Sequence, residues 1–116
     1  MPDNPLFWLG SSRNDLQAFP PDVRHVAGFQ LRRVQQGLEA NDWKPVPTVG
    51  PGVREIRIHT GLEHRVFYVS KFTEGVYVLH AFEKRARKTP KRDLELARDR
   101  FRAVVMKRRT DNSTER

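Results

Sequence analysis

The sequence predicts a small α+β domain in which a mainly antiparallel sheet of about four strands is packed by two N-terminal helices and followed by a C-terminal helix. Two observations predict it. Residues 53–82 hold three runs rich in Val, Ile, Phe and Tyr, separated by short turns that contain Gly61 and Gly75, which is typical of an antiparallel meander. On either side, apolar residues recur at three- and four-residue steps over 21–38 and 90–107, as they do in amphipathic helices.

The N-terminal part supplies one strand and two helices. The run Leu6–Leu9 is apolar and is a candidate first strand. A short helix is expected over about 13–19, and Pro20–Pro21 separates it from the second helix, because proline is tolerated in a first helical turn. Residues 39–52 hold three prolines and two glycines and are expected to form a loop. The meander strands are expected at 53–59, 64–72 and 76–82.

The 116 residues are expected to form one domain. The polar end, about residues 108–116, is expected to be disordered. No run approaches the roughly 20 apolar residues of a membrane span, and the N-terminus lacks the pattern of a signal peptide. The absence of cysteine excludes disulfides, thiolate metal sites and a cysteine nucleophile, and it fits a cytoplasmic protein.

The charge balance predicts a polyanionic partner. The chain has 22 Lys and Arg against 14 Asp and Glu, a formal net charge of +8, and this excess attracts nucleic acid or an acidic protein. Six cations and no anion stand in Lys84–Arg92, here called the basic segment. A solvated loop is one interpretation. The other is a phosphate-binding edge, whose candidate side chains are Arg87, Lys88, Lys91 and Arg92.

A second group of charges lies within the strands. Because side chains alternate along a strand, Glu55, Arg57 and His59 are predicted to share one face, with Arg65 on the neighbouring strand. A surface network of cross-strand ion pairs is one interpretation. The other is a metal-free phosphodiester site that activates the 2′-hydroxyl of RNA. Glu55 is then the candidate base and Arg65 the cation at the phosphate. Arg57 and the cations of 84–88 are candidates for charge stabilisation or for proton donation.

The histidines offer fewer indications of a site. His80 lies alone in the apolar strand VYVLHAF, where histidine is more often a hydrogen-bonded core residue than a catalyst, and it is kept as a further candidate. His59 and His64 flank a turn and are expected to be exposed. No two histidines and a carboxylate stand at metal-ligand spacing, so neither a metal nor a cofactor is expected.

The ordered segments REIRI, HRVFYV, YVLHAFEKRARKTP and DLELARDRF resemble the RelE superfamily of bacterial toxins. Within it, the HigB-like or phage-derived Gp49-like branch is the most similar, and the upstream segments WLGSSRNDLQAFPPDVR and VGPGVREIR resemble that branch too. The resemblance covers roughly residues 6–105. No single motif is diagnostic, but their order and spacing together are specific.

The resemblance implies a RelE-like α+β fold and a toxin of a type II toxin–antitoxin system. Such a toxin is a ribosome-dependent mRNA endoribonuclease, or mRNA interferase, a hydrolase that binds RNA, inhibits translation and arrests growth. It implies a cognate antitoxin, commonly a helix-turn-helix protein, and contact with operator DNA only through the antitoxin complex. A bacterial cytoplasmic location follows, with no membrane partner.

The resemblance also assigns residues. Arg65 matches the strand arginine used at the scissile phosphate, and Glu55 and Arg57 match positions that supply a base or a cation. Further catalytic cations are implied at Lys84, Arg85 and Arg87. Several relatives have a tyrosine or histidine near the C-terminus, whereas neither follows His80 here. The general acid is therefore not identified by the resemblance.

Two other functions remain open at this point. In the first, the protein has the same fold but does not cleave RNA, and it acts by binding nucleic acid or the ribosome. The other is the ParE-like branch of the same superfamily, which targets DNA gyrase. A gyrase poison needs a protein-binding surface more than a charged strand face, so REIR and HRVFYV favour the ribonuclease.

Overall fold

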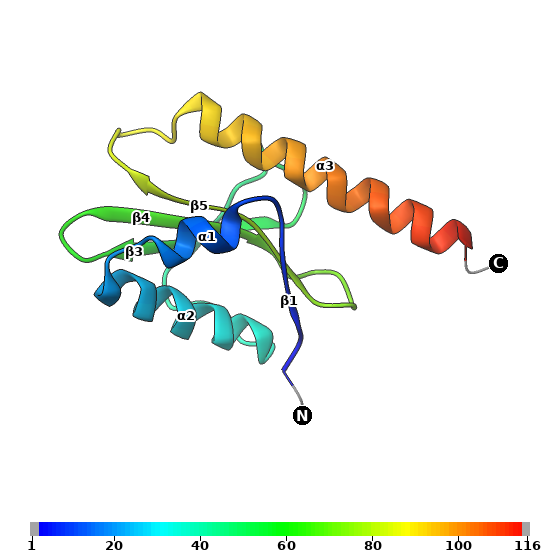
Figure 1. Ribbon diagram of the computed structural model, residues 1–116, viewed down its shortest axis with the longest axis horizontal. Coiled ribbons are helices and arrows are strands. Elements are labelled where there is room, and N and C mark those ends of the chain that lie inside the picture. Colours follow the sequence, from blue (N-terminus) through cyan, green and yellow to red (C-terminus); the bar gives the residue numbers. More distant parts are fainter. Residues whose placement is uncertain (1–2, 115–116) are drawn as a thin grey trace.

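The computed structural model describes residues 3–114 and has an α+β architecture of three helices and one five-stranded mixed sheet, as Figure 1 shows. In chain order the elements are β1 (Leu6–Trp8), α1 (Ser12–Gln17), α2 (Pro21–Gln35), β2 (Trp43–Pro45), β3 (Val53–His59), β4 (Glu63–Val69), β5 (Val76–Lys84) and α3 (Lys91–Thr114). The predicted α+β class and C-terminal helix are confirmed. Over the described range, no helix carries a stretch that is apolar and long enough to cross a membrane.

The sheet has the order β1-β5-β4-β3-β2. Its centre is the predicted antiparallel meander of β3, β4 and β5. The candidate first strand is present and lies at an edge, where β1 pairs in parallel with β5. The prediction that 39–52 is entirely loop is wrong, because β2 pairs antiparallel with β3 at the other edge. Pro45 is tolerated in β2 because an edge strand needs no hydrogen-bond donor on its outer side. A side-chain contact also joins β2 to β3, since the Arg54 guanidinium lies 3.9 Å from the centre of the Trp43 ring.

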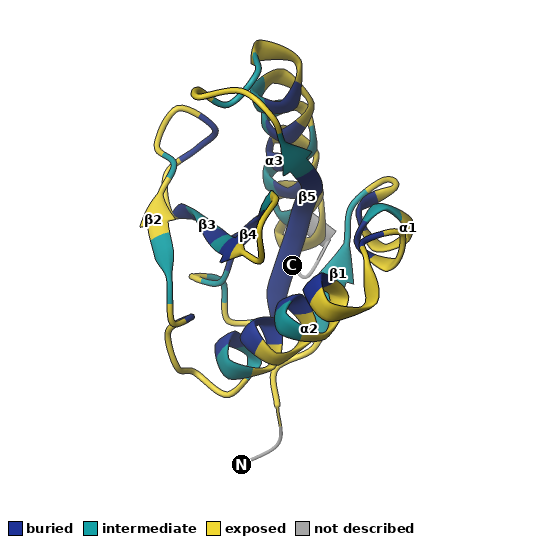
Figure 2. Cartoon of the chain, turned by 90° about the vertical axis from the view of Figure 1, so that its left-hand side faces the viewer, coloured by how far each residue is buried: buried dark blue, intermediate teal, exposed yellow. Residues whose placement is uncertain are grey.

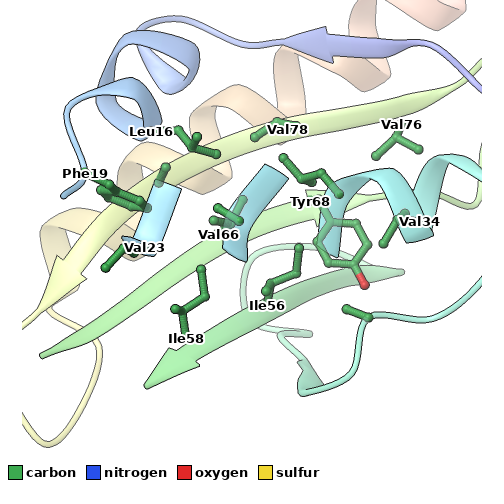
Figure 3. Packing of buried hydrophobic residues seen from close by; sticks show 14 residues of the cluster. Leu16, Phe19, Val23, Val34, Ile56, Ile58, Val66, Tyr68, Val76 and Val78 are labelled. Carbon is green, nitrogen blue, oxygen red and sulfur yellow. The ribbon is translucent and has the colours of Figure 1, made fainter. Parts of the chain in front are cut away.

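Both faces of the sheet are covered by helices. Helices α1 and α2 pack on one face and α3 on the other (Figure 1). Figure 3 shows the first of the two cores, in which Leu16 and Phe19 lie over Val66 and Val78, and the Tyr68 ring lies beside Val34. The second core joins residues of α3 to the opposite face and includes Phe67, Leu79, Ala97, Phe101 and Val104. Burial on both faces explains why β4 and β5 are apolar at successive positions.

A β-bulge in β5 decides where His80 lies. Phe67 of β4 is opposite His80, but the next residue, Tyr68, is opposite Val78, so Leu79 is an extra residue in β5. Simple alternation would place Leu79 and His80 on opposite faces. The bulge instead leaves both on the side of α3, where Leu79 joins the second core and His80 reaches Asp93 of that helix.

Helix α3 is longer than predicted. It continues to Thr114, so disorder of the tail is wrong for residues 108–114, and residues 115–116 lie outside the described range. The cause is a contact with the turn between β4 and β5. Arg108 Nε donates to Glu74 Oε2 at 2.6 Å, and its guanidinium lies 3.9 Å from the centre of the Phe72 ring. These contacts extend the helix beyond its apolar stripe.

Candidate functional site

The charged strand residues meet on the face of the sheet that α3 partly covers. In the register of the meander, Arg57 of β3 lies opposite Arg65 of β4, and His59 lies opposite Glu63. Glu63 in turn lies opposite Lys84, the last residue of β5. Directly opposed residues share a face, so these side chains all point to one side. The tip of the β3–β4 hairpin and the connection from β5 to α3 lie at the same end of the molecule (Figure 1).

Arg65 is buried and surrounded by carboxylates. The residue is 5% exposed, its Nη2 lies 3.0 Å from Glu63 Oε1, and its Nε lies 3.9 Å from Glu55 Oε1. Nη1 donates to the main-chain oxygen of His64 at 3.0 Å. Nε has no hydrogen-bond acceptor although it is buried. An unpaired buried donor costs about 1–3 kcal/mol.

Arg57 and Glu55 do not pair with each other. Arg57 Nε donates to Asp42 Oδ1 at 3.1 Å, and Asp42 lies in the connection between α2 and β2. The Glu55 side chain is 14% exposed and faces Arg65 instead. Asp42 has no signal in the sequence that connects it with the strands. Glu63 had one, because it stands two residues before Arg65 and therefore shares its face.

His59 joins the two halves of the site. Its Nε2 lies 2.8 Å from Asp42 Oδ2, and its Nδ1 lies 2.6 and 2.7 Å from the two oxygens of Glu63. The hydrogen bond from His59 lowers the pKa of Glu63, and Arg65 adds to this effect, while partial burial opposes it. The result is a continuous set of contacts, here called the charged network, which consists of Arg57, Asp42, His59, Glu63, Arg65 and Glu55.

The basic segment follows β5 next to this network. Figure 2 shows the strand buried and the connection after it exposed. Arg85 pairs with Glu83 at 3.1 Å and Lys91 with Glu95 at 3.7 Å. The other cations of the segment form no ion pair with any residue in the described range; they are Lys84, Arg87, Lys88 and Arg92. Self-repulsion among such unpaired charges favours the binding of an anion.

A hollow of about 480 Å³ lies at the junction of the basic segment with β5 and α3. Its lining includes Arg85 and Arg92, and also the carboxylates of Glu83 and Asp93. Both signs of charge therefore border it, and any phosphate there would have to lie on the arginine side.

The two buried histidines lie on opposite faces. His80 is 5% exposed, its Nε2 lies 2.7 Å from Asp93 Oδ1, and its ring stacks on Phe82 with centres 4.8 Å apart. This is the environment of a hydrogen-bonded core histidine. The expectation that His64 is exposed is wrong, because it points to the α1–α2 side, is 2% exposed and packs edge-on against Phe19. The expectation for His59 is confirmed, since its side chain is 44% exposed.

No group of three or more His, Cys, Asp or Glu side chains within residues 3–114 is arranged to hold a metal ion. The charged network contains three carboxylates and one imidazole, but the carboxylates face the histidine and the arginines. As observed, the network is a set of ion pairs.

Comparison with known protein families identifies the family to which the chain belongs. The family model described as Phage derived protein Gp49-like (DUF891) matches residues 14–102, a range that includes the charged network and the basic segment. Among curated proteins, none matches the chain. Gp49-like proteins are associated with the toxins of toxin–antitoxin systems. Since the match extends over most of the chain, from α1 into α3, the chain belongs to the family of phage-derived Gp49-like proteins.

Proposed function

We propose that the chain is the toxin of a type II toxin–antitoxin system and that it cleaves mRNA on the ribosome. One observation carries the proposal. Arg65 lies beside Glu55 on a sheet face that is bordered by the exposed basic segment. A carboxylate, an arginine and an exposed basic surface thus lie on adjacent elements. Attack by a 2′-hydroxyl needs a base, a cation that stabilises the phosphate and a surface that holds it, and these groups have the chemistry for those three roles.

The proposed reaction needs no metal. Glu55 accepts the proton of the 2′-hydroxyl, and the 2′-oxygen attacks the adjacent phosphorus. Arg65 and Arg57 stabilise the added negative charge of the transition state, with assistance from Lys84 and Arg85. The bond from phosphorus to the 5′-oxygen breaks and leaves a 2′,3′-cyclic phosphate and a 5′-hydroxyl.

The free protein holds Arg65 in a charge-compensated state. Its Nη2 is bound by Glu63 and its Nε faces Glu55. A phosphate therefore has to displace or share the Glu63 carboxylate before it forms the two parallel hydrogen bonds that arginine offers. Such tightening upon substrate binding is usual for catalytic contacts that are loose in the free enzyme.

The partners follow from the toxin assignment. We propose a cognate antitoxin of helix-turn-helix type that neutralises this protein. The protein contacts operator DNA only through its complex with this antitoxin. The net charge of +8 is complementary to mRNA and ribosomal RNA. The site of action is then the bacterial cytoplasm, where translation takes place.

A second candidate function rests on the burial of Arg65. Its residue exposure of 5% and its two carboxylate neighbours are also what a structural ion-pair network would show. In this case the protein binds RNA or the ribosome through the basic segment and does not cleave. The two candidates differ in one measurable respect, the appearance of cut mRNA.

The test is a reconstituted translation reaction in which mRNA cuts are mapped by primer extension. Wild-type protein is expected to cut mRNA only when ribosomes are present. Arg65→Ala is expected to lower the cleavage rate by a factor of about 100 or more, because it removes a charge-stabilising donor. Glu55→Gln is expected to lower the rate as well and to change its dependence on pH. Arg13→Ala serves as the matched control, because Arg13 is exposed and lies in α1.

The outcomes separate the alternatives. Intact mRNA together with growth arrest and ribosome binding would support the non-cleaving candidate. Intact mRNA together with gyrase trapped on DNA would support a ParE-like toxin. Full cleavage by a folded Arg65→Ala variant would remove Arg65 from its role. Circular dichroism of each variant shows whether it has folded.

A further inference from the structure

The hydrogen-bond geometry of His59 places a carboxylate at each ring nitrogen. Nε2 faces Asp42 Oδ2 at 2.8 Å, and Nδ1 faces both oxygens of Glu63 at 2.6 and 2.7 Å. An ionised carboxylate accepts hydrogen bonds and donates none. A proton on either ring nitrogen therefore has a carboxylate oxygen within hydrogen-bond distance to accept it.

Carboxylates from two different elements contact the His59 ring. Asp42 reaches the ring from the α2–β2 connection and Glu63 from β4, so two carboxylates are in direct contact with it. The nearby cations lie one contact further away, since Arg57 binds Asp42 and Arg65 binds Glu63. Lys84 of β5 lies opposite Glu63 in the sheet register. The His59 ring thus has carboxylates in direct contact and cations only beyond them.

His59 also has the access that a proton donor needs. Its side chain is 44% exposed, whereas that of Arg65 is 6% exposed and that of His80 is 7% exposed. It lies on the same face as Arg57, two residues along β3, and its cross-strand neighbour Glu63 contacts Arg65. Of the histidines in β3, β4 and β5, it alone combines exposure with a place in the charged network.

We infer that His59 is the general acid of this site and protonates the leaving 5′-oxygen of the RNA. The inference rests on the proposed ribonuclease function. While Glu55 takes the proton of the 2′-hydroxyl, the bond from the 2′-oxygen to phosphorus forms and the bond from phosphorus to the 5′-oxygen breaks. The proton on one ring nitrogen of His59 passes to the 5′-oxygen, which leaves as a hydroxyl. The neutral imidazole then regains a proton from water.

Glu63 couples this step to phosphate binding. Its carboxylate is shared between Arg65 Nη2 at 3.0 Å and His59 Nδ1 at 2.6 Å. When a phosphate takes the place of Glu63 at Arg65, the carboxylate remains at His59 and keeps the ring oriented. The other nitrogen, now facing Asp42, exchanges that partner for the leaving oxygen. Asp42 and Glu63 are therefore positioning residues, and His59 alone transfers the proton.

The first test uses two synthetic mRNAs that differ in one atom. One has the natural 5′-oxygen at the cleaved bond, and the other has sulfur there, which leaves as a thiolate without protonation. His59→Gln is expected to slow cleavage of the oxygen substrate by a factor of about 100 or more, the usual contribution of a general acid. It is expected to leave cleavage of the sulfur substrate unchanged. The matched control is His25→Gln, because His25 is exposed on α2 and should affect neither substrate.

The results distinguish the role of His59 from the ribonuclease function itself. An equal loss on both substrates, or no loss on either, would overturn the role of His59 while the ribonuclease function stands. Failure of the wild type to cut both substrates would overturn the ribonuclease function and the inference that rests on it.

Discussion

Residue by residue, the charged network is built so that each cation contacts a carboxylate. Arg57 binds Asp42, Arg65 binds Glu63, and His59 lies between the same two carboxylates. Only Glu55 has a long contact, 3.9 Å from Arg65 Nε. The oxygens of Glu63 are held by hydrogen bonds with His59 and Arg65, whereas Glu55 has only this long contact. This difference in contacts favours Glu55 over Glu63 as the proton acceptor.

The pH dependence of stability should report on Glu63. Its pKa in the folded protein lies below the ordinary 4.5, chiefly because of the hydrogen bond with His59. A lowered folded pKa stabilises the protein above the unfolded value, and this contribution is lost as pH falls through the folded value. Urea unfolding measured from neutral to acidic pH should therefore show stability falling below about pH 4.5, and Glu63→Gln should make this fall shallower.

The control for this measurement is Glu95→Gln. Glu95 is exposed on α3, and its one ion pair, with Lys91, is 3.7 Å long. Replacing Glu95 should leave the fall in unfolding free energy at acidic pH the same as in the wild type. An equal flattening by both variants would mean that net charge, and not the network, governs the effect.

Side-chain alternation predicted part of this site and could not predict the rest. Glu55, Arg57 and His59 share a face because the period of a strand is two, which needs no knowledge of tertiary structure. Asp42 reaches the network through a tertiary contact from a different connection. The burial of Arg65 was also not predictable from alternation, since it depends on the contacts of its guanidinium with Glu63 and Glu55.

Among the elements, the junction of β5 with α3 positions the basic segment. His80 near the middle of β5 and Asp93 in the first turn of α3 form a buried contact of 2.7 Å. The segment between them carries the six cations. This one side-chain contact therefore joins the strand before the basic segment to the helix after it.

Breaking this contact should lower stability before it affects chemistry. His80→Gln and Asp93→Asn each leave a buried partner poorly paired, which costs about 1–3 kcal/mol of unfolding free energy. Urea unfolding measures this loss. The exposed His25→Gln is the control and should stay within about 0.5 kcal/mol of the wild type. If His80→Gln leaves stability unchanged and abolishes mRNA cleavage, His80 is a catalyst and the interpretation as a core residue is wrong.

Element boundaries were predictable where local patterns decide them. The strand expected at 53–59 is β3 with the same limits, because its apolar alternation ends at the turn containing Gly61. The extension of α3 to Thr114 depends on Arg108 meeting Glu74 and Phe72 of a distant turn. The bulge at Leu79 depends on the register with β4. Interactions of this kind leave no periodic signal in the sequence.

At the scale of the whole molecule, the apolar contacts and the unpaired charge are kept apart. Helices cover both faces of the sheet and bury two cores. Four cations that form no ion pair within the described range, Lys84, Arg87, Lys88 and Arg92, stand together at one end, from the last residue of β5 to the first turn of α3. That end also holds the tip of the β3–β4 hairpin (Figure 1). A cluster of unpaired cations thus lies at the same end of the molecule as the charged network.

This arrangement predicts that RNA affinity depends on the basic segment more than on net charge. Arg87→Gln with Lys88→Gln removes two exposed, unpaired cations. On single-stranded RNA each phosphate contact contributes about 0.7 to the slope of log affinity against log salt, so the double variant should lower the slope by about 1.4. The control, Arg13→Gln with Lys107→Gln, removes the same charge from exposed positions on α1 and α3. Fluorescence anisotropy across a salt titration measures the slope for each variant. The two variants have the same net charge. Equal slopes would therefore show that long-range attraction, without localised phosphate contacts, accounts for RNA binding.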